Sequence, residues 1–343
     1  MSAHVESELR RLEDAIGRAV DAAVAAEAPD FVAFVADHLS RSPAAEVAAQ
    51  QQQQQQFAAE AVGCHALQGD KSYQEDRAVA ARLGSHLYAA VFDGHVGDTA
   101  AEFCRTHVHA ELATQLQQAP AAAGAALSNA LKVANEAFLA SDPDDASGTT
   151  ACVLLLSPTN GGGAADGEPP CALLHVANIG DSRAVLFTEG SGVEQLTTDH
   201  KPDDDAEYAR IEAAGGSIFD AEDGQGGRVV GPDNCSMLAC ARSVGDRLFK
   251  STSPPLVPCE ADVGERVVRV GSGSAAGFAL VASDGVWEVL TNERACEVVR
   301  AALDSGASAD AAAAALCDAA LAAGSEDNIS AAVLALGAAA AQA

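Results

Sequence analysis

The stretch "YAAVFDGHVGD", residues 88–98, decides how this chain is expected to fold and where its chemistry lies. An apolar run ends in an acid, Asp93, which is followed by Gly94 and His95. The same order recurs in "FALVASDGVW", residues 278–287, where the acid is Asp284. Two strands that each carry a carboxylate at one end can direct both carboxylates at one point. Such oxygen ligands are typical of Mg²⁺ or Mn²⁺ sites, so we expect a divalent metal site.

Further acids stand at the boundaries of other apolar runs. Asp181 follows "VANIG", Asp327 precedes "NISAAVLAL", and Glu75 and Asp76 lie in a polar turn. Any one of them alone is more simply explained as a residue that caps a turn. Their joint placement favours a metal cluster, because acids gathered in one place repel one another unless cations neutralise them.

Composition limits the class of protein. With 343 residues, 48% of them hydrophobic, the chain can form one large domain with a sizeable core, plus an appendage. The net charge of −29 argues against nucleic acid as a partner, because the phosphate backbone would be repelled. Nine cysteines at irregular spacing, with no CxxC pair, favour reduced thiols and a cytoplasmic or nuclear location.

Neither secretion nor a membrane is expected from the sequence. The first residues, "MSAHVESELRR", carry acids early and lack the apolar core of a signal peptide. No uninterrupted apolar run reaches the roughly 18 residues that a membrane helix needs.

After residue 60 the pattern consists of short β-like runs and pairs of helices. The runs at 62–83, 85–94, 149–157, 171–188, 265–270, 278–285 and 328–336 predict strands. The segments 98–118, 125–141, 203–216, 292–303 and 309–324 predict helices. Strand runs interspersed with helix pairs indicate a layered α+β domain. Short links between consecutive strands favour antiparallel pairing.

The N-terminal residues form a separate segment. Apolar side chains between residues 5 and 40 recur every three or four positions and predict a helical hairpin, with Asp30 capping its second helix. A hairpin this small cannot bury its apolar face alone, so it either packs on the main domain or associates with another chain. The glutamine run, residues 50–56, is a linker. We therefore divide the chain into a helical appendage (1–48), a Gln-rich linker (49–60), a main domain (61–338) and an Ala-rich tail (339–343).

The main domain resembles the metal-dependent Ser/Thr protein phosphatases of the PPM, or type 2C, family. Nine motifs occur in the family's order: "KSYQEDR", "VFDGHVGDTAA", "SGTTA", "VANIGDSRAVL", "LTTDHKPDDDAEYARIEAAGG", "LACARSVGDRLFK", "LVPCEADV", "LVASDGVWEVL" and "GSEDNISAAVLAL". The resemblance implies a four-layer α-β-β-α sandwich with two central antiparallel sheets. It also implies that phosphoserine and phosphothreonine in phosphoproteins are hydrolysed by a metal-activated hydroxide, without a phosphoenzyme.

The resemblance implies two bound Mn²⁺ or Mg²⁺ ions. On matching positions, Asp93 would bridge both ions. Glu75 and the backbone carbonyl of Gly94 would complete the coordination of one ion, and Asp284 and Asp327 would bind the other.

Five more residues receive roles from the resemblance. Asp181 matches a third, weaker metal position, Asp76 would hold metal-bound water, and Asn328 would fix the geometry around its neighbour. His95 matches the general acid that protonates the leaving group. Lys71 stands where the family usually has an arginine that binds the substrate phosphate, and lysine lacks the two-pronged geometry of arginine. Three other departures are Val96, Ala261 and Glu288, where the family favours Gly, Pro and Asp.

Two functions remain open at this stage. The retained acids and histidine favour an enzyme. The alternative is a catalytically silent phosphatase fold that binds phosphoproteins or partners through its N-terminal hairpin. That hairpin, with "APDFVAFVADHL" as its second helix, resembles RIIa-type docking and dimerisation hairpins, so residues 5–40 would form a homodimer or dock on a partner.

Overall fold

The computed structural model describes residues 61–119, 122–158, 171–220, 226–272 and 277–338, together with Ile16. Its contacts divide the chain into two units, Met1–Ala59 and Glu60–Ala343. The predicted linker and tail lie outside the described residues, and so does the predicted hairpin except for Ile16. Over the described ranges, none of the helices has the length and apolar character required to span a membrane.

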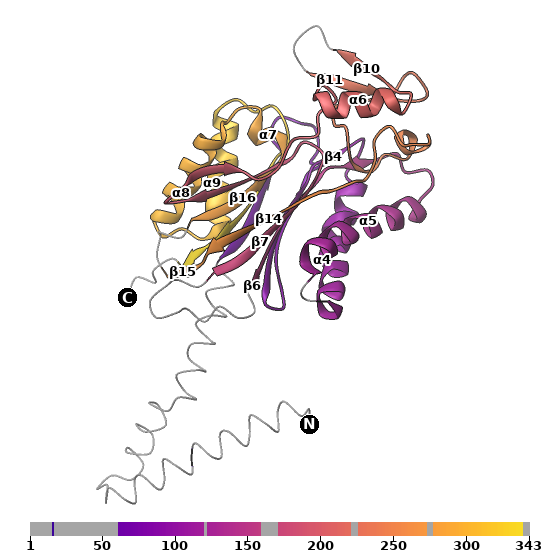
Figure 1. Ribbon diagram of the computed structural model, residues 1–343. Coiled ribbons are helices and arrows are strands. Elements are labelled where there is room, and N and C mark those ends of the chain that lie inside the picture. The colour runs from indigo at the N-terminus through magenta and orange to yellow at the C-terminus, as the bar shows by residue number, and fades with distance from the viewer. Residues whose placement is uncertain are drawn as a thin grey trace, which may run out of the picture. The chain divides into compact units, whose positions relative to one another are not determined.

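Two five-stranded antiparallel sheets form the centre of the second unit (Figure 1). The first sheet has the order β1 (Val62–Leu67), β17 (Ile329–Ala335), β16 (Phe278–Ala282), β8 (Arg183–Thr188) and β9 (Gly192–Gln195). The second has the order β14 (Asp262–Arg269), β7 (Cys171–Ile179), β6 (Ala151–Pro158), β3 (His86–Phe92) and β2 (Arg77–Leu83). Every residue of β16 and β17 is buried, because both faces of these strands are covered.

Helix pairs cover the outer faces of both sheets (Figure 1). Helices α4 (Thr99–Gln118) and α5 (Ala123–Ser141) pack on the second sheet, and α8 (Asn292–Asp304) and α9 (Ala309–Ala322) pack on the first. Cys104, Val108, Leu112 and Leu116 lie four residues apart and give α4 one continuous buried stripe. The predicted four-layer α-β-β-α sandwich is therefore confirmed, and so is the antiparallel pairing within its central sheets.

A smaller layer stands beside the sandwich and has a core of its own. It consists of the predicted helix α6 (Asp205–Ala213) and a sheet of β10 (Ser217–Asp220), β11 (Gly227–Val230) and β12 (Met237–Leu238). This sheet was not predicted, since strands of two to four residues carry too little periodicity to detect.

Several short elements lie near the ends of the main strands. They are β4 (Gly94–His95), β5 (Gly148–Thr149), β13 (Val244–Gly245), a 3-10 turn η2 (Arg247–Lys250), α7 (Asp284–Trp287) and the parallel pair β15 (Gly271–Ser272) and β18 (Gly337–Ala338). Strands β13, β5 and β4 form a three-stranded sheet of their own. These elements hold most of the residues discussed below.

Candidate metal and catalytic site

The predicted acids come from the ends of separate strands. Asp93 directly follows β3, and Asp76 directly precedes β2. Asp181 comes two residues after β7, and Asp327 comes two residues before β17. Asp284 begins the short helix α7 after β16, so the sequence correctly placed it beyond a strand but missed the helix. In Figure 1, α7 and β4 lie at the same end of the sandwich.

Electrostatic interactions show that these acids form one cluster. Burial raises the pKa of Asp93 well above its ordinary value, and the negative charges of Asp76, Asp284, Asp181 and Asp327 raise it further. The pKa of Asp284 is raised in the same way, first by burial and then by Asp181. The charges of neighbouring carboxylates oppose one another's ionisation. A divalent cation bound among them would offset this repulsion and stabilise the ionised forms.

Asp76 lies deepest in this cluster, with 2% of its surface exposed. Burial raises its pKa to about 6, although hydrogen bonds oppose the rise. The Ser283 hydroxyl donates to Asp76 Oδ2 at 2.8 Å and accepts from the backbone N–H of Ser330 at 3.0 Å. Residues next to α7 and in β17 thereby fix the orientation of the Asp76 carboxylate.

Lys71 reaches the cluster from the turn after β1. Its Nζ lies 2.8 Å from Asp327 Oδ1, and its side chain is half exposed. Burial alone would lower the pKa of Lys71, but Asp327, Asp284 and Asp93 outweigh it and raise the pKa. The lysine is therefore a charged group at the edge of the site, within reach of solvent.

The Asn328 side chain binds three backbone groups of the turn between β1 and β2. Its side-chain oxygen accepts from the Glu75 N–H at 2.8 Å, and its Nδ2 donates to the carbonyls of Gln68 (2.7 Å) and Tyr73 (3.1 Å). Its own N–H donates to Asp327 Oδ1 at 2.6 Å. One buried amide thus fixes the turn that carries Glu75 against the start of β17.

Close backbone packing positions Gly94. A Cβ on this residue would lie 2.5 Å from the Glu75 carbonyl oxygen, so the position requires glycine for space and not for an unusual φ angle. The Glu75 side chain is fixed as well, because its Oε1 accepts from the Gly97 N–H at 2.6 Å. The carbonyl of Asp93 accepts from the N–H and the hydroxyl of neighbouring threonines, Thr150 and Thr149.

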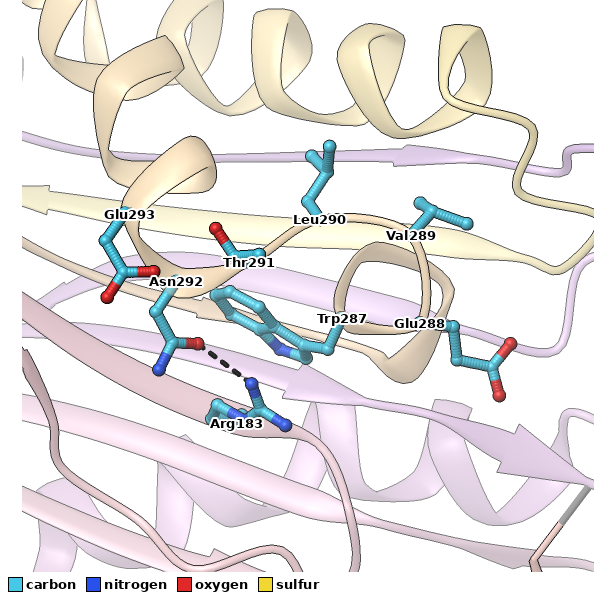
Figure 2. A pocket seen from close by; sticks show the side chains of 8 residues that line it. All are labelled: Arg183, Trp287, Glu288, Val289, Leu290, Thr291, Asn292 and Glu293. Carbon is cyan, nitrogen blue, oxygen red and sulfur yellow. Dashed lines mark hydrogen bonds between the residues drawn. The ribbon is translucent and has the colours of Figure 1, made fainter. Parts of the chain in front are cut away.

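Contacts of Trp287, the last residue of α7, hold this short helix in place. Arg183 lies 5.1 Å from the ring centre of Trp287, and its Nη1 donates to Asn292 Oδ1 at 2.8 Å (Figure 2). The Trp287 Nε1–H donates to the Ala282 carbonyl at 2.8 Å. Arg183, Trp287 and Asn292 line an open pocket, and their contacts fix α7, whose first residue is Asp284.

Comparison with known proteins identifies the family. The sequence model of the family Protein phosphatase 2C matches residues 37–329. The chain belongs to the protein phosphatase 2C family. The resemblance of the main domain to type 2C phosphatases is thereby confirmed.

Several relatives share this family. Protein phosphatase 2C 53 of Oryza sativa subsp. japonica is 35% identical over 74% of this chain and 59% of its own length. Protein phosphatase 2C 77 of Arabidopsis thaliana is 33% identical over 64% of this chain and 47% of its own. The chain therefore spans about half the length of these plant relatives. Protein phosphatase 2C homolog 1 of Saccharomyces cerevisiae is 34% identical over 62% of this chain and 70% of its own.

Solved structures share the fold. The serine-threonine phosphatase 2C from Toxoplasma gondii superposes with a TM-score of 0.64 at 25% identity, covering 79% of this chain and 93% of its own. A sex determining protein of C. elegans has the same TM-score at 23% identity, covering 79% of this chain and 64% of its own.

The donor set of this family member suits Mn²⁺ or Mg²⁺, which prefer carboxylate and carbonyl oxygens. Across the described residues, no three His, Cys, Asp or Glu side chains stand close enough to enclose an ion directly. Several carboxylate oxygens are instead turned to protein partners, as Asp327 is to Lys71 and Asp76 is to Ser283. The feature that fits a metal site is that the carboxylates of the cluster raise one another's pKa, as they do at Asp93 and Asp284.

One residue near His95 was missing from the sequence-based site. Asp246 Oδ2 lies 2.7 Å from His95 Nε2, and Asp246 is 3% exposed. Burial alone would lower the pKa of His95, but the Asp246 carboxylate outweighs it and raises that pKa. Asp246 belongs to the motif "LACARSVGDRLFK", yet no spacing in the sequence indicates that it meets a histidine 151 positions away.

Val96, another departure from the family pattern, follows His95 with φ of 60° and 69% of its surface exposed. A β-branched residue is strained in this left-handed region, where glycine is not.

Proposed function

We propose that this chain is a metal-dependent protein serine/threonine phosphatase. The observation that carries the proposal is the cluster of mutually repelling acids at the strand ends of a protein phosphatase 2C domain. The names of the yeast, plant and Toxoplasma relatives support the same activity. The substrates would be phosphoproteins.

The proposed metal site holds two Mn²⁺ or Mg²⁺ ions. Asp93 would bridge them, Glu75 and the Gly94 carbonyl would serve one, and Asp284 and Asp327 would serve the other. Asp181, which is also in the cluster, would serve a weaker third position. When bound, such ions lower the pKa of a shared water, so that hydroxide is present near neutral pH. Asp76 would orient metal-bound water, and Asn328 keeps the Glu75 turn and Asp327 in fixed relation.

The remaining side chains would act on the substrate. Lys71 is a solvent-accessible cation at the edge of the cluster, so it would bind the phosphate of the substrate and leave its pairing with Asp327. His95 would donate a proton to the departing serine or threonine oxygen, which is a poor leaving group as an alkoxide. Because this reaction needs only water as the nucleophile, no phosphoenzyme forms.

Hydrolysis of a phosphothreonine peptide with and without Mn²⁺ tests this function. We expect turnover that EDTA abolishes and that Asp93→Asn reduces at least about 10²-fold, since a bridging ligand is lost. The matched control is Asp304→Asn, which removes an exposed carboxylate at the end of α8 and should retain wild-type turnover. Absence of turnover at saturating Mn²⁺ in a folded protein would favour the alternative, a silent phosphatase fold that only binds phosphoproteins.

A further inference from the structure

We propose that Asp246 is a positioning residue for His95. Its carboxylate fixes the orientation and the tautomer of the His95 ring and leaves Nδ1 as the atom that gives a proton to the leaving group. This inference rests on the proposed phosphatase function and adds a residue to it. The structural basis is a hydrogen bond of 2.7 Å between His95 Nε2 and Asp246 Oδ2. Because a carboxylate can only accept, Nε2 carries a proton in this pair, and Nδ1 is the nitrogen that remains for chemistry.

The Asp246 side chain is a fixed, ionised acceptor. Burial would raise its pKa, but His95 and Lys250 outweigh that effect and lower it. Lys250 comes from the same segment, and its Nζ donates to the hydroxyl of Ser243 at 3.1 Å. The residues "SVGDRLFK", 243–250, therefore supply the carboxylate together with a nearby cation that keeps it charged.

The backbone around Asp246 is equally constrained. Its φ of 48° lies in the left-handed region, which Asp tolerates better than most residues. The Asp246 N–H donates to the Ser147 carbonyl at 3.0 Å, and the preceding residue, Gly245, donates to Asn135 Oδ1 of α5 at 3.0 Å. Because its backbone is hydrogen-bonded and its carboxylate stays ionised, Asp246 can hold the His95 ring in one orientation.

The three-stranded sheet β13-β5-β4 brings the two side chains together. Gly148 of β5 pairs with His95 of β4 on one side and with Gly245 of β13 on the other. A Cβ on Gly148 would lie 2.0 Å from Asp246 Oδ2 and 2.4 Å from His95 Nε2. The hydrogen-bonded pair thus spans the central strand at Gly148, where any side chain would collide with both partners.

The step that depends on this pair is the departure of the alcohol. Hydroxide forms a bond to phosphorus while the P–O bond to the serine or threonine oxygen breaks. The Nδ1–H bond of the charged imidazole breaks as the alcohol O–H bond forms, so the ring becomes neutral and retains its Nε2 proton toward Asp246. Water from solvent later returns the proton to Nδ1.

Leaving groups of different basicity test the role of Asp246. A phosphothreonine peptide needs a proton on its leaving oxygen, whereas p-nitrophenyl phosphate releases a phenolate that is stable near neutral pH. We expect Asp246→Asn to lower kcat on the peptide about 10²- to 10³-fold, and on p-nitrophenyl phosphate less than about 10-fold. His95→Gln should give the same pattern, and the double variant should lose little more than either single one.

A second His–Asp pair supplies the matched control. Asp262 Oδ2 at the start of β14 lies 3.1 Å from His200 Nε2, and His200 Nδ1 already accepts from the backbone N–H of Gly180 at 3.1 Å. Asp262→Asn should change kcat on the peptide and kcat on p-nitrophenyl phosphate by the same factor. An equal loss on both substrates in Asp246→Asn would overturn the proposal and leave the phosphatase function standing. A wild-type protein inactive on both substrates with Mn²⁺ would refute the function itself.

A measurement on the wild-type protein covers the case in which Asp246→Asn fails to fold. Nitrogen-15 NMR of the imidazole reports which ring nitrogen carries the proton in the neutral form. We expect the Nε2–H tautomer for His95, and its assignment can be made with His95→Gln. A neutral His95 protonated on Nδ1 would contradict the proposal.

Discussion

Adding one methyl group at Gly94 tests whether the packing of β4 against the Glu75 turn builds the metal site. In Gly94→Ala the new Cβ would lie 2.5 Å from the Glu75 carbonyl oxygen and 3.2 Å from Ala101 Cβ. Cβ atoms essentially never come within 3.0 Å of another heavy atom, so the two segments must separate by about 0.5 Å or more. The clash is with backbone on one side, so rotation of a side chain cannot relieve it.

This separation should reduce both stability and turnover. Overpacking of this kind typically costs about 1–3 kcal/mol of unfolding free energy. Because Gly94 and Glu75 are proposed ligands of the same ion, a shift approaching 1 Å should lower kcat by roughly 10- to 100-fold. Thermal unfolding and Mn²⁺-dependent peptide hydrolysis measure the two effects.

Gly190→Ala is the matched control for Gly94→Ala. A Cβ at Gly190 meets no atom within 4 Å, and its φ lies outside the left-handed region. We expect its stability to change by no more than about 0.5 kcal/mol and its turnover to stay at the wild-type level. Wild-type stability and kcat in Gly94→Ala would refute the packing argument, because the strand and the turn would then not be in contact.

Three further changes have defined outcomes. Lys71→Arg should lower the KM for a phosphopeptide, since arginine binds phosphate with two parallel hydrogen bonds; an unchanged or higher KM would show that Lys71 does not contact phosphate. Val96→Asn should raise the unfolding free energy by about 1 kcal/mol, because Asn tolerates the left-handed φ of 60°, and a lower melting temperature would contradict this. Burial raises the pKa of Asp76 to about 6 in the folded protein, above the ordinary 3.8, so the folded protein binds this proton more tightly than the unfolded chain does. The metal-free wild type therefore loses stability as pH rises from about 4 to about 6, and the loss is complete above that pH. Asp76→Asn in EDTA should therefore gain stability relative to wild type between pH 5 and 7, as chemical denaturation would measure, whereas a pH-independent difference would argue against a raised pKa.

The sequence predicts the parts of the site that depend on local pattern. Asp93 and Asp284 follow apolar runs and are each followed by glycine, so their places beyond strand ends could be read directly. The order of motifs then indicated the sandwich and its helix pairs. These features are local, because an eight-residue strand or a fourteen-residue helix carries its own periodicity.

The sequence could not reveal contacts that depend on tertiary packing. Asp246 meets His95 only because β13, β5 and β4 align around Gly148, and these strands have two residues each. The ion pair of Lys71 with Asp327 likewise joins the turn after β1 to the residues before β17. No periodic signal marks such elements, and no spacing rule connects positions so far apart in the chain.

Calorimetric titration of the metal-free protein with Mn²⁺ tests the central claim most directly, because that claim is that the strand-end acids hold divalent ions. We predict two strongly bound Mn²⁺ ions per chain in the wild type. Asp93→Asn should lose the binding of both, since Asp93 is proposed to bridge them, while Asp304→Asn should bind like the wild type. Mn²⁺ binding that is unchanged in a folded Asp93→Asn protein would contradict the assignment of this cluster as the metal centre.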